Sequence, residues 1–472
     1  MHITSPQRVR IDSETARLTT LVSLSAWTML MLSGPLLLAE PAEAVYARVD
    51  AYITERMRQA GVPGAAFAVI SNDTIVHFRG IGAADPEGRS IERQTPFGIG
   101  SVSKSFGALA AMQLVEAGKL DLDVPVQRYL PNFQTTDPIA SARITVRHLL
   151  HHQSGLPTFV NHADCGARHD PTEALNRAIK FMAKVHLKDP PGQAFRYSDP
   201  GYVVLAAVVQ EVSGRPFEQY LKEAVFAPLR MQHSFTSEIE AMKDGAATGY
   251  RYWFGNAIPH KGLSSCYFDP LAGGGLYCSA EDLAKYLIVH MSNGRSGNTR
   301  ILSEAGFERL HKPEVQMNGW MHYAMGWMII SKRAEWPLMI AHSGITPKYL
   351  AYATMIPDQH IGFALLFNSN ARGDCLENIE FDVARMLVGM APLQKTRSSI
   401  RTSLLQRIEC AFTVLLMATV VARAVWRLYR PRMHVSADRP GRKWRIIRSG
   451  VALLLCLAGL YKLRECFFGE VV

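Results

Sequence analysis

Strand-like segments occur at two places that are far apart in the sequence, and this separation most constrains the fold. Residues 65–85 contain two β-runs joined by Ser-Asn-Asp at residues 71–73, which indicates a hairpin. Residues 338–369 return to β character after a long stretch, residues 120–320, of loops and helices. Antiparallel strands from both regions can share one sheet, with the helices forming a second lobe. We therefore predict an α/β (α+β) fold with a small-molecule site between the lobes.

Residues 1–44 have the pattern of an export signal. Basic residues precede an apolar stretch at residues 19–40, and Ala-Glu-Ala at residues 42–44 gives a small-x-small site. This order is typical of a secretory signal peptide, and an uncleaved N-terminal anchor is the alternative. The exported domain would then be residues 45–391.

Two further apolar segments lie near the C-terminus, at about residues 410–426 and 449–463. Arginine and lysine residues crowd the region between them, as in a cytoplasmic loop. Although each segment is shorter than the roughly 20 residues that a span prefers, the pattern predicts two transmembrane helices within residues 409–472. A pair of buried or interfacial helices is the alternative. Residues 392–408 would be the linker.

The formal net charge of +10 comes to a large extent from this C-terminal basic cluster. Nucleic-acid binding would need that charge on a folded face. We therefore expect membrane lipid as a partner and no nucleic acid.

Four of the seven cysteines fall in the predicted exported domain, where disulfides can persist: Cys165, Cys266, Cys278 and Cys375. Four cysteines allow three full pairings, and the sequence does not choose among them. Buried free thiols are the alternative for some of them. Because none lies at a short metal-ligand spacing, we expect no metal site.

Residues 98–106, Gly-Ile-Gly-Ser-Val-Ser-Lys-Ser-Phe, contain a candidate catalytic pair. Ser101 and Lys104 are three positions apart, so on a helix they share one face and the ammonium can reach the hydroxyl. A serine needs a base to act as a nucleophile, and a lysine can be that base only if its pKa is lowered. On spacing alone, an N-capping serine beside a solvated lysine is the alternative.

Two later elements complete a recognisable set. Tyr-Ser-Asp at residues 197–199 precedes an apolar helix, and His-Ser-Gly at residues 342–344 ends a β-run. With Ser-x-x-Lys at residues 101–104, they resemble the serine β-lactamase and penicillin-binding-protein superfamily, especially its class C β-lactamase-related branch (peptidase family S12). Other stretches match too, including VPGAAFAVI, ITVRHLLHHQSGLP and AGGGLYCSAEDLAKYL, so that the resemblance covers about residues 45–390.

The resemblance implies a β-lactamase-like fold and roles for individual residues. Ser101 would be the nucleophile that becomes acylated, and Lys104 its proton partner. Tyr197 would pass the proton to the leaving group, and the main-chain N–H groups of Ser101 and Ile345 would form the oxyanion hole. Neither a metal nor an organic cofactor is implied. The residues expected at the substrate are Asp199, His342, Ser343, Gly344 and Ile345.

Asp199 stands where the family usually has asparagine. An amide donates to a substrate carbonyl, whereas a carboxylate only accepts. A carboxylate near Lys104 would raise the pKa of its ammonium, so we expect Lys104 to stay charged and Tyr197 to do more of the base work. Capping of the following helix by Asp199 is the alternative.

His342 replaces the lysine that is common in β-lactamases. Lysine supplies a fixed positive charge for a substrate carboxylate, whereas histidine is largely neutral at pH 7. This difference weakens the expectation of efficient penicillin hydrolysis and suits esterase-like or peptidase-like members. A packed strand-end histidine is the alternative.

Two other clusters receive structural interpretations. His148, His151 and His152 resemble metal ligands, but their place beside the Gly-Leu-Pro turn at residues 155–157 favours packing at a helix end. The three glycines at residues 273–275 lack the context of a phosphate loop and predict a close backbone approach near the site.

These features together predict an exported, membrane-anchored serine hydrolase that cleaves amide or ester bonds of small molecules or peptides. By analogy with the family, its catalytic domain would lie on the extracytoplasmic side of a bacterial cell (inner) membrane, where cell-wall peptides are a candidate substrate. The alternative is a domain of the same fold that binds penicillin or wall fragments without turnover and acts as a sensor.

Overall fold

The computed structural model describes most of the chain between residues 41 and 393. The described residues are 41–160, 171–253, 256–260, 273–297, 299–370, 376, 378–393, 408, 411–420 and 422–423. The chain divides into two compact units, Met1–Val45 and Tyr46–Val472, and the sheet and helical lobe lie in the second.

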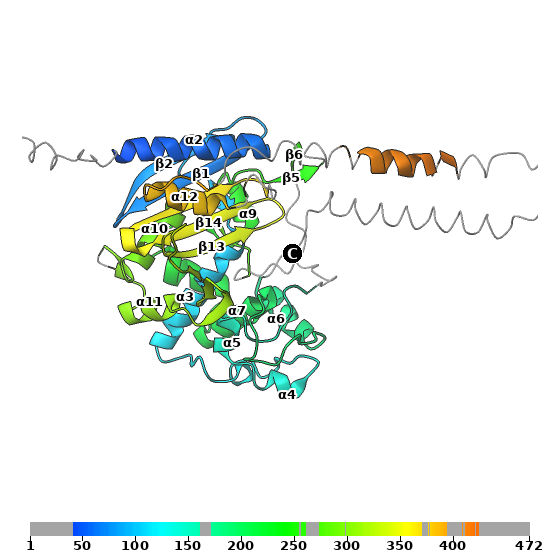
Figure 1. Cartoon of the computed structure of the whole chain (residues 1–472). Helices are drawn as coiled ribbons and strands as arrows, with labels where there is room; N and C mark the ends of the chain where they lie inside the picture. The colour runs from blue at the N-terminus through cyan, green and yellow to red at the C-terminus, as the bar shows by residue number, and fades with distance from the viewer. Residues whose placement is uncertain are drawn as a thin grey trace, which may run out of the picture. The chain divides into compact units, whose positions relative to one another are not determined.

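One antiparallel sheet forms the centre of the fold, with eight strands in the order β10-β11-β12-β13-β14-β15-β1-β2 (Figure 1). The strands are β1 (Gly64–Ser71), β2 (Thr74–Gly82), β10 (Val315–Asn318), β11 (Met321–Tyr323), β12 (Met328–Ile330), β13 (Met339–Ile345), β14 (Leu350–Ile356) and β15 (Ile361–Phe367). The early strand β1 pairs with the late strand β15, with Ala65 opposite Phe367. The predicted sharing of one sheet is therefore confirmed.

Helices cover both faces of the sheet. Since successive residues of a strand point to opposite sides, neighbouring positions on one strand face different helices. On β14, Ala353 belongs to the large apolar core, and α10 (Ala280–Met291) contacts β14, β15 and β1. The next residue, Thr354, instead donates a hydrogen bond to Glu380 of α12 (Ile379–Leu387). The core between α10 and the sheet is thus separated from the face that α12 covers.

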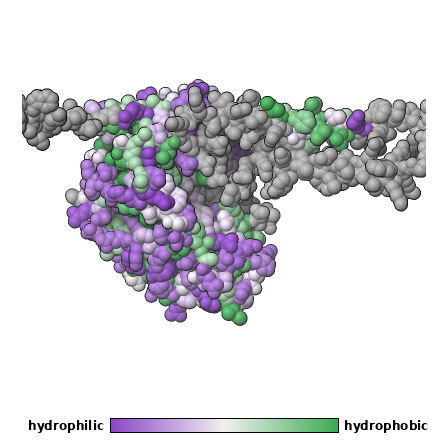
Figure 2. Space-filling model, in the orientation of Figure 1, coloured by the Kyte–Doolittle hydropathy of each residue, from purple (hydrophilic) through white to green (hydrophobic). Residues whose placement is uncertain are grey.

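The helical lobe comes from the chain between β2 and β10. Its main helices are α3 (Ser103–Glu116), α4 (Pro138–Ser141), α5 (Val146–Leu150), α6 (Pro171–Met182), α7 (Asp199–Ser213), α8 (Phe217–Leu221) and α11 (Glu304–His311). α7 contacts α3, α5 and α6, and Figure 1 shows these helices on one side of the sheet. Figure 2 shows a mainly hydrophilic surface on the visible face of this lobe.

α3 is the central helix of the lobe. Its residues from Ser103 to Met112 are all buried, as expected for a helix that is apolar or small on every side. The Ser-x-x-Lys motif lies on the short 3₁₀ turn η1 (Gly100–Val102) and the start of α3. Gly118 follows the end of α3 with a φ of +68°, which glycine adopts without strain.

The remaining elements are one long helix, α2, and several short helices and strands. They are α2 (Ala42–Ala60), α9 (Glu238–Lys243), η2 (Val126–Arg128), η3 (Lys222–Phe226), η4 (Pro357–Gln359), β3 (Pro96–Gly98), β4 (Ser234–Phe235), β5 (Tyr250–Trp253), β6 (Asn256–Pro259), β7 (Tyr277–Ser279), β8 (Arg295–Ser296) and β9 (Thr299–Arg300). A small sheet joins β3, β7 and β4, and two hairpins join β5 to β6 and β8 to β9.

The predicted membrane segments fall mostly outside the described residues. Residues 411–420, inside the first predicted C-terminal span, are helical, whereas residues 449–463 are not described. Across the part of the chain that is described, no helix has the length and apolar character needed to cross a membrane. Among the four cysteines of the predicted exported domain, Cys278 is a buried free thiol and the other three lie outside the described residues.

Candidate active site

The turn that carries Ser101 lies directly against strand β13, and two glycines permit this contact. Gly100 has a φ of +51°, and a Cβ atom on it would lie 2.6 Å from the main-chain nitrogen of Ile345. A Cβ atom on Gly344 would lie 1.8 Å from the carbonyl oxygen of Ile99 and 3.1 Å from the nitrogen of Ser101. The main-chain nitrogens of Ser101 and Ile345 are therefore both at the junction of η1 and β13.

Lys104 is fully buried in the first turn of α3, and its ammonium group is surrounded by oxygen atoms. Its Nζ lies 3.0 Å from Ser101 Oγ and 2.6 Å from the carbonyl oxygen of Gly273. Asp199 Oδ1 lies 2.7 Å from the same nitrogen. The ammonium thus donates hydrogen bonds to the serine and carbonyl oxygens and is ion-paired with the carboxylate. The predicted close approach of the residue 273–275 glycines to the site is also observed: a Cβ atom on Gly274 would lie 3.6 Å from the Gly100 carbonyl carbon.

The pKa of Lys104 reflects opposing influences. Burial lowers it because a charged group is costly in a dry interior, but the nearby Asp199 carboxylate and Tyr197 raise it by more, so that the pKa ends above its usual value. Lys104 is consequently an ammonium ion at neutral pH. This direction agrees with the expectation drawn from Asp199 in place of asparagine.

Tyr197 faces the same ammonium from the start of α7. The Lys104 Nζ lies 4.9 Å from the centre of the Tyr197 ring. Burial raises the pKa of Tyr197, while Lys104 and a hydrogen bond with Ser101 lower it in part, and the net shift is upward. Tyr197 is therefore a neutral phenol in the resting site, in contact with both Ser101 and Lys104.

Asp199 occupies the first turn of α7 but does not cap it. The N-cap is Ser198, whose side chain accepts a hydrogen bond from the Gly201 N–H group. The capping alternative for Asp199 is therefore wrong, because Ser198 already fills that position. The Asp199 side chain is instead ion-paired with Lys104 and is 21% exposed.

His342 is buried in the middle of β13, and both of its ring nitrogens lie near protein oxygens. Nδ1 is 2.7 Å from the Ser343 carbonyl oxygen and Nε2 is 3.1 Å from the Tyr323 hydroxyl. Because a carbonyl oxygen only accepts, Nδ1 carries the proton and Nε2 accepts from Tyr323. Burial and the positive charge of Lys104 lower the pKa of His342 to about 3. His342 is thus a neutral, packed histidine, while Ser343 is half-buried beside it.

Three groups at this site were not predicted as functional. They are the Gly273 carbonyl oxygen, the Tyr323 hydroxyl and His152, whose ring centre lies 4.3 Å from that of Tyr197. The only indication for His152 in the sequence was its place in a stretch that resembles the family. A main-chain oxygen has no signature in a sequence, and Tyr323 lies on a strand, β11, that the sequence did not indicate.

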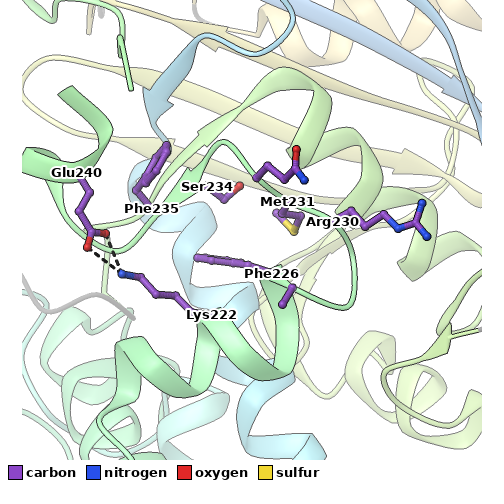
Figure 3. A pocket seen from close by; sticks show the side chains of 9 residues that line it. Lys222, Phe226, Arg230, Met231, Ser234, Phe235 and Glu240 are labelled. Atoms are coloured by element: carbon purple, nitrogen blue, oxygen red, sulfur yellow. Dashed lines mark hydrogen bonds and ion pairs between the residues drawn. The ribbon is translucent and has the colours of Figure 1, made fainter. Parts of the chain in front are cut away.

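Other places in the described structure do not form a rival site. Over the residues with defined placement, no group of three or more His, Cys, Asp or Glu side chains could hold a metal ion. A surface hollow of about 590 Å³ lies between η3 and β4, with Phe226, Phe235 and Met231 in its wall (Figure 3). At its edge Lys222 Nζ and Glu240 Oε1 are 2.9 Å apart, so each neutralises the other, and none of the lining residues belongs to the Ser101 cluster.

Comparisons with known sequences agree with the motifs. A family model described as Beta-lactamase matches residues 49–382. Protein flp of Staphylococcus aureus (strain MW2) is 23% identical over 325 residues, a match that spans 69% of this chain and 63% of that protein. Penicillin-binding protein 4 of Amycolatopsis lactamdurans is 28% identical over 354 residues, covering 72% of this chain and 88% of the relative.

Comparisons with solved structures support the same fold. An octameric penicillin-binding protein homologue from Pyrococcus abyssi superposes with a TM-score of 0.64 at 28% identity, covering 76% of this chain and 81% of that chain. A class C beta-lactamase superposes with a TM-score of 0.63 at 20% identity, over 76% of this chain and 99% of the neighbour. At that identity the second likeness concerns the fold alone.

Proposed function

The chain belongs to the Beta-lactamase family, and from that membership we propose that it is a serine hydrolase that forms an acyl-enzyme on amide or ester bonds. The observation that carries the proposal is the 3.0 Å contact between Ser101 Oγ and Lys104 Nζ. It brings the hydroxyl of a candidate nucleophile to a buried ammonium that Tyr197 also faces.

The proposed first step is attack of Ser101 Oγ on the carbonyl carbon of the substrate. A phenol can accept a proton at its oxygen while it donates its own. Tyr197 can therefore take the Ser101 proton as it gives its proton to the departing alcohol or amine. The charged Lys104 stabilises negative charge that develops on Ser101 Oγ and on the Tyr197 phenol oxygen. The N–H groups of Ser101 and Ile345 stabilise the oxyanion that forms from the substrate carbonyl. Water then cleaves the acyl-enzyme and releases the acid.

The charge balance of the cluster favours substrates that do not depend on a carboxylate next to the scissile bond. Lys104 is paired with Asp199, and His342, with a pKa of about 3, carries no charge at pH 7. Esters and neutral amides therefore fit this proposal better than penicillins, whose carboxylate would find no fixed partner in the cluster.

A sensor that becomes acylated without turnover is the second candidate function. It is favoured by the raised pKa values of both Lys104 and Tyr197, since neither group is ready to activate the deacylating water. A long-lived acyl-enzyme would follow from such a site.

One experiment separates the two candidates. The purified full-length chain is treated with a fluorophosphonate probe, a fluorescent penicillin and a p-nitrophenyl ester, with Ser101→Ala as the control. Probe labelling that requires Ser101, together with steady ester turnover, supports the hydrolase. Stable labelling by penicillin without ester turnover supports the sensor, and equal labelling of the Ser101→Ala variant contradicts both.

Exchange of Asp199 for asparagine should shift the pH dependence of catalysis. The carboxylate holds the pKa of Lys104 above its usual value, so its removal should lower that pKa and increase the free-amine fraction at lower pH. Because the proposed mechanism uses the charged ammonium, we expect the falling alkaline limb of the kcat/KM profile of Asp199→Asn to move to lower pH. Profiles of ester hydrolysis that coincide for both proteins would show that Asp199 does not control the charge of Lys104.

We also propose that residues 409–472 anchor the chain in the bacterial inner membrane with the catalytic domain outside the cytoplasm. Two apolar segments flank a basic stretch near residues 427–448, which supports a cytoplasmic loop. Alkaline phosphatase should be active when fused after residue 391 and inactive when fused after residue 440. The reverse pattern would contradict the proposed orientation.

A further inference from the structure

His152 lies two residues after the end of α5 and has an unusual backbone conformation. Its φ is +56°, in the left-handed region that side-chain-bearing residues seldom adopt, with asparagine, aspartate and histidine the more frequent exceptions. Its side chain is completely buried. Such a conformation persists only where the surroundings enforce it, and it occurs often at functional sites.

The two amides on either side of Tyr197 both donate to His152. The Arg196 N–H donates to the His152 carbonyl oxygen at 2.7 Å, and the Ser198 N–H donates to His152 Nδ1 at 3.0 Å. One residue therefore holds the main chain before and after the phenol. The left-handed backbone of His152 is what presents its carbonyl oxygen and its ring to the same short segment.

The ring of His152 also packs against the Tyr197 side chain. The ring centres are 4.3 Å apart with an interplanar angle of 38°, and the Tyr323 ring lies 4.5 Å from that of His152. Burial, aided by the charge of Lys104, lowers the pKa of His152 well below its usual value. The ring is consequently neutral, with Nδ1 free to accept from Ser198 and the proton on Nε2.

The neighbouring histidines serve different purposes. His148 forms a capping box with Thr145 at the start of α5. The Nδ1 of His151 lies 3.0 Å from the Arg147 carbonyl oxygen, and its Nε2 lies 3.5 Å from Glu314. His151 is as buried as His152, but its polar contacts are with Arg147 and Glu314, away from the Tyr197 segment. It is therefore a matched control.

We propose that His152 is a positioning residue that fixes the Tyr197 phenol over the Lys104 ammonium through Nδ1, its carbonyl oxygen and its ring face. This inference rests on the proposed function, in which Tyr197 transfers the proton between Ser101 and the leaving group. Loss of the Nδ1 acceptor would remove the hydrogen bond from the Ser198 N–H group and let the Tyr197 phenol move. A displacement of about 1 Å at a reacting group can lower the rate about 10²-fold.

Two variants test the role of the ring acceptor. His152→Gly tolerates the positive φ and keeps the carbonyl oxygen, but it lacks Nδ1. His152→Asn also tolerates this backbone, and its side-chain oxygen can take the place of Nδ1. In His152→Gly we expect kcat for ester hydrolysis to fall about 10²-fold, while KM changes by less than about threefold. In His152→Asn we expect most of the wild-type kcat to be recovered. His151→Asn should keep the wild-type kcat.

Hydrogen–deuterium exchange supplies a readout that does not depend on activity. Peptides that contain residues 196–198 should exchange faster in His152→Gly than in wild type and His152→Asn. Equal kcat in wild type and His152→Gly would overturn the positioning role. A decrease of kcat in all three variants that is in proportion to the decrease of their melting temperatures would overturn it too. If wild type shows no turnover, the proposed function fails, while the exchange data still decide whether His152 holds the Tyr197 segment.

Discussion

Replacing Lys104 with methionine should lower kcat/KM for ester hydrolysis by about 10³-fold or more, within the range seen when a proton-transfer or charge-stabilising group is lost. Methionine keeps much of the side-chain volume, so the cavity changes little. It removes the ammonium that contacts Ser101 Oγ, Asp199 and the Gly273 carbonyl oxygen. The rate of acylation by a p-nitrophenyl ester, measured under single-turnover conditions, checks this expectation.

The same substitution should destabilise the protein, because it leaves the Asp199 carboxylate without its counter-ion. Breaking a fully buried pair costs about 3–5 kcal/mol, and the cost here should be smaller because the Asp199 side chain is 21% exposed. The double variant Lys104→Met/Asp199→Asn should recover part of the melting temperature and remain inactive. Activity of Lys104→Met within about tenfold of wild type would remove Lys104 from the mechanism.

Replacing Gly344 with alanine should lower kcat by about 10²–10³-fold, as expected when an oxyanion donor is displaced. The new Cβ atom would lie 1.8 Å from the Ile99 carbonyl oxygen, a separation that no packed structure tolerates. The η1 turn and strand β13 must therefore move apart, which separates the main-chain nitrogens of Ser101 and Ile345. Steady-state ester hydrolysis together with thermal denaturation measures the effect.

Gly319→Ala is the matched control, because a Cβ atom there would meet nothing within 4 Å. It should change neither kcat nor the melting temperature by much. If Gly344→Ala keeps the wild-type kcat, the junction between η1 and β13 is not the place where the oxyanion is stabilised.

Much of the central sheet could be predicted from the sequence, because β1, β2 and β13–β15 are continuous β-runs with turn residues between them. β10, β11 and β12 could not, since each is only three or four residues long and lies beside a region read as loops and helices. Strands of that length carry too few residues to establish a twofold alternation.

The candidate site could also be predicted only in part from the sequence. Ser101, Lys104 and Tyr197 have motifs, and the structure brings these three together. The contacts that arrange them use main-chain atoms, including the Gly273 carbonyl oxygen and the Ser198 N–H group, and every residue has such atoms. The role of Asp199 needed the structure too, because both an ion pair and a helix cap suit an aspartate at the start of a helix.

The pairing of β1 with β15 has a consequence for biosynthesis. β1 is buried along nearly its whole length, yet one of its two neighbours in the sheet is made last, at Ile361–Phe367. A nascent chain that has only reached residue 350 therefore exposes an apolar strand with an open hydrogen-bonding edge, which is prone to association with other chains. The sheet can close only after almost the whole domain has been synthesised, so shielding by a chaperone matters most for this protein before residue 367 emerges.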